Sequence, residues 1–261
     1  MKSHIWPALG GLAVAIAITT TMDATGYAMF SALPLLPLVG LFWYLQKFSR
    51  TEIGLVWGRA RFYGLAIVYP FLVLGAVAAI AYAFHAVDTS NTDWTKALLN
   101  MGLMSSVGTL IVLLTEEGFF RGWLWASLTK AGYGDTSVLI GSTLAFTAWH
   151  ISAISLDTGF DIPADEIPIY LINATLIGGI FGIFRMISGS AVVPSLCHAV
   201  WNGINYPLFG FGEKPGALGI EETHLYGPEV GLLGIGLNLA FFAFLWRKYV
   251  PDVHEISSNI H

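Results

Sequence analysis

Thr115-Glu116-Glu117-Gly118-Phe119-Phe120-Arg121-Gly122 is a stretch in which three ionisable residues interrupt an otherwise apolar segment. Apolar sequence continues on both sides of it, over residues 105–114 and 123–128. On insertion scales, one charged residue at the centre of a spanning helix is unfavourable by about 2.5–3.5 kcal/mol, and such residues are usually retained for function. The sequence therefore predicts that this stretch lies within a membrane and carries the chemistry of the protein.

The composition is that of a membrane protein. Of the 261 residues, 55% are hydrophobic and 11% are charged, whereas charged residues make up about 25% of a typical soluble domain. The net charge is -5 and the Lys and Arg residues form no cluster outside short loops, which excludes a nucleic-acid partner. The single cysteine, Cys197, excludes an intrachain disulfide. We expect an integral membrane protein whose surroundings are the lipid bilayer.

A membrane-spanning helix needs about 20 largely apolar residues. The chain contains eight candidate spans, at residues 5–22, 27–46, 62–84, 96–130, 137–155, 167–187, 191–209 and 230–249. The fourth is too long for one upright crossing, so it should tilt, kink or begin with a short interfacial helix. The first has the alternative of being a cleaved signal peptide, although a retained span suits the charge pattern. We expect one all-α domain over residues 1–261, a compact bundle of about eight transmembrane helices.

Charged loop residues predict the orientation, because cytoplasmic loops carry an excess of Lys and Arg. One side of the predicted bundle holds most of the cations, at Lys2, Lys47, Arg50, Arg59, Arg61, Lys130, Arg185, Arg247 and Lys248. The other side holds Lys96, Lys214 and most of the acids, at Asp23, Asp88, Asp93, Asp157, Asp161, Asp165, Glu166, Glu213, Glu221, Glu222 and Glu229. Both termini should therefore be cytoplasmic, in a prokaryotic cell membrane or the endoplasmic reticulum.

Three pairs of residues have the i,i+4 spacing that places both members on one face of a helix. They are Glu117 with Arg121, Phe146 with His150, and His198 with Asn202. In the first pair, the charges of Glu117 and Arg121 can neutralise each other. Glu116 has no such partner on its own helix, so a buried Glu116 must be protonated, bind a metal or contact a partner on another helix. Each pair can also serve helix packing alone.

Together these helices supply a carboxylate, two imidazoles and an amide, a set that can deprotonate a water and stabilise an oxyanion. A zinc site is the alternative, with Glu116, His150 and His198 as three ligands and water as the fourth. The sequence does not decide between a site without a cofactor and a site with Zn²⁺. The presence of both a base and an oxyanion donor favours the metal-free form.

The three motifs, in this order on successive apolar segments, resemble the CPBP (Abi) family of intramembrane proteases. That family includes CAAX prenyl endopeptidases of the Ras-converting-enzyme type and bacteriocin-processing or self-immunity proteins. The resemblance covers about residues 105–206. It implies an intramembrane endopeptidase whose catalytic core lies at about residues 96–209, with the active site among helices four to seven.

The resemblance also implies the roles of individual residues. Glu116 and His150 would activate a water for attack on a peptide carbonyl, and His198 and Asn202 would stabilise the oxyanion. The supporting residues would be Glu117, Arg121 and Phe146. The substrate would be a membrane-associated protein or peptide, prenylated at its C-terminus in the eukaryotic branch. Separately, the positions of Glu116 and His198 in the predicted spans, counted from the cytoplasmic end at Lys130, predict access from the cytoplasmic leaflet.

Two other functions remain open from the sequence. In a proton- or cation-coupled transporter or channel, Glu116, His150 and His198 would form the ion path. Inverted repeats would favour a transporter, and the sequence contains none. In a non-catalytic membrane scaffold, the motif residues would be dispensable.

Overall fold

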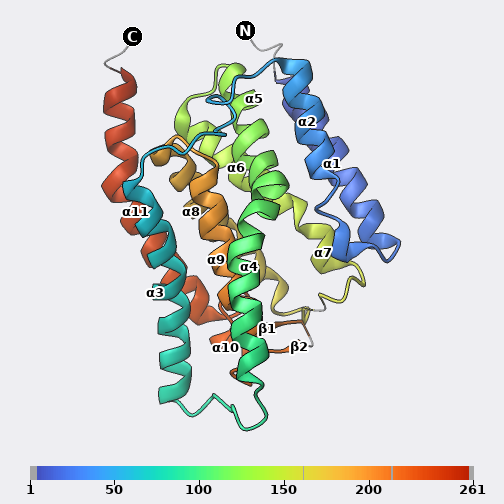
Figure 1. Cartoon of the computed structure of the whole chain (residues 1–261), viewed down its shortest axis with the longest axis vertical. Helices are drawn as coiled ribbons and strands as arrows, with labels where there is room; N and C mark the ends of the chain where they lie inside the picture. Colours follow the sequence, from blue (N-terminus) through green and yellow to red (C-terminus); the bar gives the residue numbers. More distant parts are fainter. Residues whose placement is uncertain (1–4, 161, 213, 259–261) are drawn as a thin grey trace.

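The computed structural model describes residues 5–160, 162–212 and 214–258, with side chains described as far as residue 250. Lys2, Asp161 and Glu213 of the predicted charge distribution lie outside these ranges. The described chain is a helical bundle with one short hairpin (Figure 1). Its elements are α1 (Trp6–Ala24), η2 (Ala28–Phe30), α2 (Leu35–Gln46), α3 (Arg61–Ala83), α4 (Trp94–Leu114), η3 (Gly118–Leu124), α5 (Trp125–Lys130), α6 (Asp135–Trp149), α7 (Ile151–Ser155), α8 (Ile167–Ser188), α9 (Val192–Phe209), β1 (Gly210–Phe211), β2 (Lys214–Pro215), α10 (Thr223–Tyr226) and α11 (Leu232–Ser258).

Six helical segments of the described chain are long and apolar enough to cross a membrane. They are Trp6–Ala24, Ala28–Gln46, Arg61–Ala83, Trp94–Lys130, Asp135–Ser155 and Ile167–Ser188. The helices α9 and α11 are not among them; α9 carries His198, Asn202 and Asn205 between its apolar residues. The mostly helical architecture of an integral membrane protein is thus confirmed, while the number of eight transmembrane helices stays a prediction.

The long fourth segment is one helical run whose regular path is interrupted at the acidic pair. The helix α4 ends at Leu114, the next residue, Thr115, has φ -113° and ψ -97°, and the chain continues into the π-helix η3. A π-helix is a wider turn that is frequent at functional sites. Two of its carbonyl groups accept side-chain hydrogen bonds, Phe120 from Ser142 Oγ at 2.9 Å and Arg121 from Arg185 Nε at 2.8 Å. The helices α6 and α8 therefore hold the interrupted segment in place.

Close helix packing is present along α8 and α9. The helix α9 packs mainly against α4, and α8 packs against α6 and α11. A Cβ atom at Gly182 would collide with Leu139, and one at Gly178 would lie 3.0 Å from the Phe146 ring. In lipid, where apolar burial gives no net drive for association, such small residues allow the backbones to approach and gain van der Waals contact.

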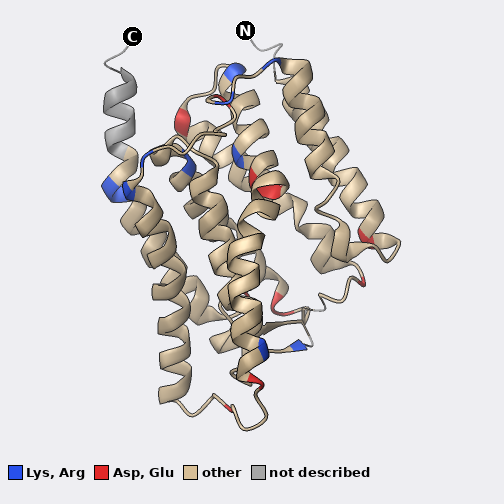
Figure 2. Cartoon of the chain, viewed as in Figure 1, with Lys and Arg blue, Asp and Glu red and all other residues tan. Residues whose placement is uncertain are grey.

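The two ends of the bundle differ in charge, as predicted. Figure 1 shows that α1 starts and α11 ends at the same end of the bundle. Figure 2 shows Lys and Arg gathered mainly at that end, whereas the opposite end carries mainly acidic residues. The assignment of the basic end to the cytoplasm stays a prediction.

Replacement of Gly203 tests the contact between α4 and α9. A Cβ atom there would collide with Ser105 and lie 3.0 Å from the Met101 carbonyl oxygen. We expect Gly203→Ala to lower the free energy of unfolding by about 1–3 kcal/mol, as in other overpacked cores. Thermal unfolding in detergent measures the effect. The matched control is Gly75→Ala in α3, where a Cβ meets nothing within 4 Å; equal melting temperatures for the two variants would contradict the packing described.

Candidate active site

The carboxylate of Glu117 lies at the centre of a fully buried polar cluster. One oxygen atom, Oε1, accepts hydrogen bonds from Arg121 Nη1 at 3.1 Å and from His198 Nδ1 at 3.0 Å. Both Glu117 and Arg121 have no exposed surface. The predicted pair within one helix is therefore formed, and it extends to α9 through His198.

Arg121 links three parts of the bundle. Besides its bond to Glu117, it donates from Nη2 to the Gly178 carbonyl oxygen of α8 at 2.7 Å. Its guanidinium carbon lies 4.3 Å from the centre of the Phe146 ring of α6, a cation–π contact that gains strength away from water. Phe146, predicted as a supporting residue, thus lies directly beneath the cation.

His198 lies between the two adjacent carboxylates of the motif. Because the Glu117 carboxylate can only accept a hydrogen bond, His198 Nδ1 carries the proton in this arrangement. The other ring nitrogen, Nε2, lies 3.9 Å from Glu116 Oε2. The Phe181 ring stacks on the imidazole with 4.8 Å between the ring centres. The orientation of His198 is therefore fixed by a charged partner and by an aromatic face.

His150 is oriented through its own helix. It follows the last residue of α6, and its Nδ1 lies 2.8 Å from the Phe146 carbonyl oxygen. Since a carbonyl oxygen only accepts, Nδ1 must be the donor, which leaves Nε2 free to accept a hydrogen bond. A neutral imidazole held in this way can bind or deprotonate a water.

Three of the four predicted catalytic residues line one small cavity. His150 of α6, with His198 and Asn202 of α9, borders a space of about 30 Å³, which is enough for about one or two water molecules. Glu116 does not line this cavity, and its side chain, 16% exposed, contacts the group through the 3.9 Å approach to His198.

The cavity also contains residues that the sequence analysis did not select, namely Tyr170, Tyr206 and Glu229. Tyr206 follows Asn202 by four residues, as Asn202 follows His198, so the i,i+4 spacing could have predicted that Tyr206 lies on the same face of the helix. Glu229 was assigned only to an acidic loop. Its carboxylate accepts a hydrogen bond from Trp201 Nε1 at 2.7 Å. Burial raises the pKa of Glu229, and this bond partly opposes the shift.

The three ligands of the zinc alternative, Glu116, His150 and His198, come from three separate segments of the bundle. Within the part of the chain that the structure describes, His, Cys, Asp and Glu side chains nowhere gather in a group of three or more that could hold a metal ion. His150 and His198 each use Nδ1 for a bond inside the protein, which leaves Nε2 of each ring as the atom that could bind a metal. A zinc site formed by Glu116, His150 and His198 stays a prediction.

Comparison with known proteins identifies the segment that carries these residues. Residues 98–204 match the family described as type II CAAX prenyl endopeptidase, Rce1-like. The match covers less than half of the chain and contains all three motifs. No curated protein and no solved structure matches. The resemblance inferred from the motifs is confirmed: residues 98–204 match the Rce1-like family model, and the Rce1-like family is a protease family.

Proposed function

We propose that this protein is an intramembrane endopeptidase of the CAAX type, which hydrolyses a peptide bond of a membrane-associated protein or peptide. The Rce1-like match supports proteolysis at the level of the family. The observation that carries the proposal is the meeting of His150, His198 and Asn202 around a cavity of water size, with Glu116 beside His198. A substrate with a prenylated C-terminus fits the family resemblance.

In the proposed mechanism, the attacking water lies at the edge of the cavity, between His150 and Glu116. His150 Nε2 accepts one hydrogen bond from this water, and Glu116 accepts its proton as the oxygen bonds to the peptide carbonyl carbon. The proton then passes to the leaving amine as the C–N bond breaks. General-base catalysis of this kind contributes about 10²–10⁴-fold to rate.

The developing oxyanion requires hydrogen-bond donors, which His198 and Asn202 supply in the proposal. Since His198 Nδ1 already donates to Glu117, His198 donates from Nε2 only as an imidazolium. The Glu117 carboxylate stabilises that charged form. Donors that are fixed before the reaction are worth about 2.7–4 kcal/mol each in comparable sites. Glu117 therefore acts through His198 and is a positioning residue.

Substitution of the proposed base and its partner tests the function. We expect Glu116→Gln and His150→Ala each to lower kcat/KM for a membrane-anchored reporter peptide by about 10²-fold or more, because each removes a proton acceptor. The control is Glu52→Gln, a carboxylate in an exposed loop. Size-exclusion profiles and melting temperatures establish that the variants are folded.

Wild-type rates in both folded variants would rule out the protease proposal. If the wild type cleaves no reporter peptide but performs proton-coupled uptake into vesicles, and both variants lose that uptake, the transporter is favoured.

Substitution of Arg121 tests whether the buried cluster stabilises the fold, without changing the proposed water-binding residues. Arg121→Ala should lower the free energy of unfolding by about 3–5 kcal/mol, because it leaves the Glu117 charge buried without its cation. Arg121→Lys should recover part of the stability, since one ammonium group cannot span both Glu117 and the Gly178 carbonyl oxygen. Denaturant unfolding in mixed micelles provides the measurement. If Arg121→Ala unfolds like the wild type, the cluster does not hold the helices together.

Metal removal tests the zinc alternative. We expect kcat/KM to be unchanged after chelation, because the proposed site already holds a base and oxyanion donors. Mass spectrometry of the purified protein should find far less than one zinc per chain. About one zinc per chain, with activity lost on chelation and restored by zinc, would overturn this expectation.

A further inference from the structure

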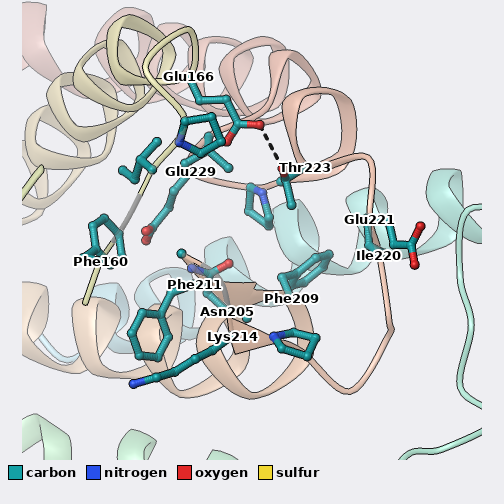
Figure 3. A pocket seen from close by; sticks show the side chains of 18 residues that line it. Phe160, Glu166, Asn205, Phe209, Phe211, Lys214, Ile220, Glu221, Thr223 and Glu229 are labelled. Atoms are coloured by element: carbon teal, nitrogen blue, oxygen red, sulfur yellow. Dashed lines mark hydrogen bonds between the residues drawn. The ribbon is translucent and has the colours of Figure 1, made fainter. Parts of the chain in front are cut away.

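A second, larger cavity adjoins the candidate site at the acidic end of the bundle. Its volume is about 590 Å³, within the range of about 300–1,000 Å³ typical of ligand sites. The hairpin, α10 and the loops before α8 and α11 form its walls (Figure 3). Glu229 lines both this cavity and the water-sized one. A group bound in the larger cavity therefore lies next to the candidate catalytic residues.

This position differs from the predicted route of access. Figure 1 shows the hairpin and α10 at the end opposite to the start of α1. In the predicted orientation the larger cavity faces away from the cytoplasm, whereas the sequence predicted access from the cytoplasmic leaflet.

The larger cavity is acidic. Its described charged residues are three acids, Glu166, Glu221 and Glu229, and one cation, Lys214. The Lys214 ammonium lies 4.8 Å from the centre of the Phe211 ring, and Glu166 accepts a hydrogen bond from Thr223 at 2.8 Å. Figure 3 shows the Glu229 side chain extending into the cavity.

Asn205 supplies an independent indication of a ligand. It is 2% exposed and lines the cavity, and its Oδ1 atom has no hydrogen-bond partner in the described structure. Figure 3 shows its amide in the same space as the Glu229 carboxylate. A buried acceptor without a partner is unfavourable by about 1–3 kcal/mol. Since Asn205 Oδ1 and the Glu229 carboxylate are both acceptors, the fitting ligand is a donor with positive charge.

Glu229 is held in position by a chain of buried hydrogen bonds. Its side chain accepts from Trp201 Nε1, and its carbonyl oxygen accepts from Asn173 Nδ2 at 3.0 Å. Asn238 donates to Asn173 Oδ1 at 3.1 Å, and the Tyr69 hydroxyl donates to Asn238 Oδ1 at 2.7 Å. The loop that carries Glu229 is therefore fixed to α3, α8, α9 and α11. A carboxylate fixed in this way forms a defined binding position.

We propose that this cavity is a subsite for a Lys or Arg side chain of the peptide substrate, with Glu229 pairing with the cation and Asn205 Oδ1 accepting one of its N–H groups. The inference rests on the proposed protease function. It predicts selectivity for peptides with a basic residue near the cleaved bond.

Matched peptides test the subsite. Membrane-anchored reporter peptides would carry either Lys or norleucine, which has a similar chain without the charge, at each position flanking the cleaved bond. We expect kcat/KM to favour Lys by about tenfold or more at one position, the value of one charge-assisted hydrogen bond. In Glu229→Gln the ratio of the two rates should fall towards one. The control Glu222→Gln removes an exposed acid that does not line the cavity and should keep the wild-type ratio.

A second variant and a binding measurement test the subsite even if Glu229→Gln does not fold. Asn205→Leu removes the unpaired acceptor at similar volume and should also reduce the Lys preference, whether or not Glu229→Gln folds. Binding of the same peptides to Glu116→Gln protein, by isothermal titration calorimetry, should show the same preference without cleavage.

The outcomes separate the two proposals. Cleavage of Lys and norleucine peptides at equal rates at every position overturns the subsite and leaves the protease proposal standing. An unchanged ratio in both Glu229→Gln and Asn205→Leu also overturns the subsite. If the wild type cleaves none of the peptides but binds the Lys form more tightly through Glu229, the protease proposal fails and the subsite stands.

Discussion

The buried hydrogen bonds on one oxygen atom of Glu117 are the constraint on which the site depends. Glu117 Oε1 accepts from Arg121 on its own segment and from His198 on α9. A buried carboxylate without these partners would be strongly unfavourable. The cluster therefore requires α9 to dock in one register. That register also brings Asn202 to the water-sized cavity and Glu116 to the second ring nitrogen of His198.

The π-helical segment after the acidic pair makes this arrangement possible. Glu117 is the residue before the π-helix, and Arg121 lies inside it. Wider π turns leave backbone carbonyl groups that need partners from elsewhere. Ser142 of α6 and Arg185 of α8 supply hydrogen bonds to two of them. Irregular backbone at membrane depth is tolerated when neighbouring helices satisfy it in this way. The π-helix η3 thus depends on its hydrogen bonds with α6 and α8.

Polar contacts between helices extend from this centre towards the acidic end of the bundle. Tyr69, Asn238 and Asn173 connect three helices and end at the main chain of Glu229. Each is buried among apolar side chains, where hydrogen bonds between helices are worth about 0.6–2 kcal/mol. They hold in place a loop carboxylate, that of Glu229, which lines both cavities.

The sequence alone determined what depends on local spacing. Apolar runs of sufficient length predicted the helices, and i,i+4 spacing predicted that Glu117 pairs with Arg121 and that His198 shares a face with Asn202, because helix geometry fixes which side chains are neighbours. Only the tertiary structure decided which faces meet. The bond from Glu117 to His198, the π-helical turn and the approach of Glu229 to the site depend on contacts between segments far apart in the chain, and no local pattern specifies those contacts.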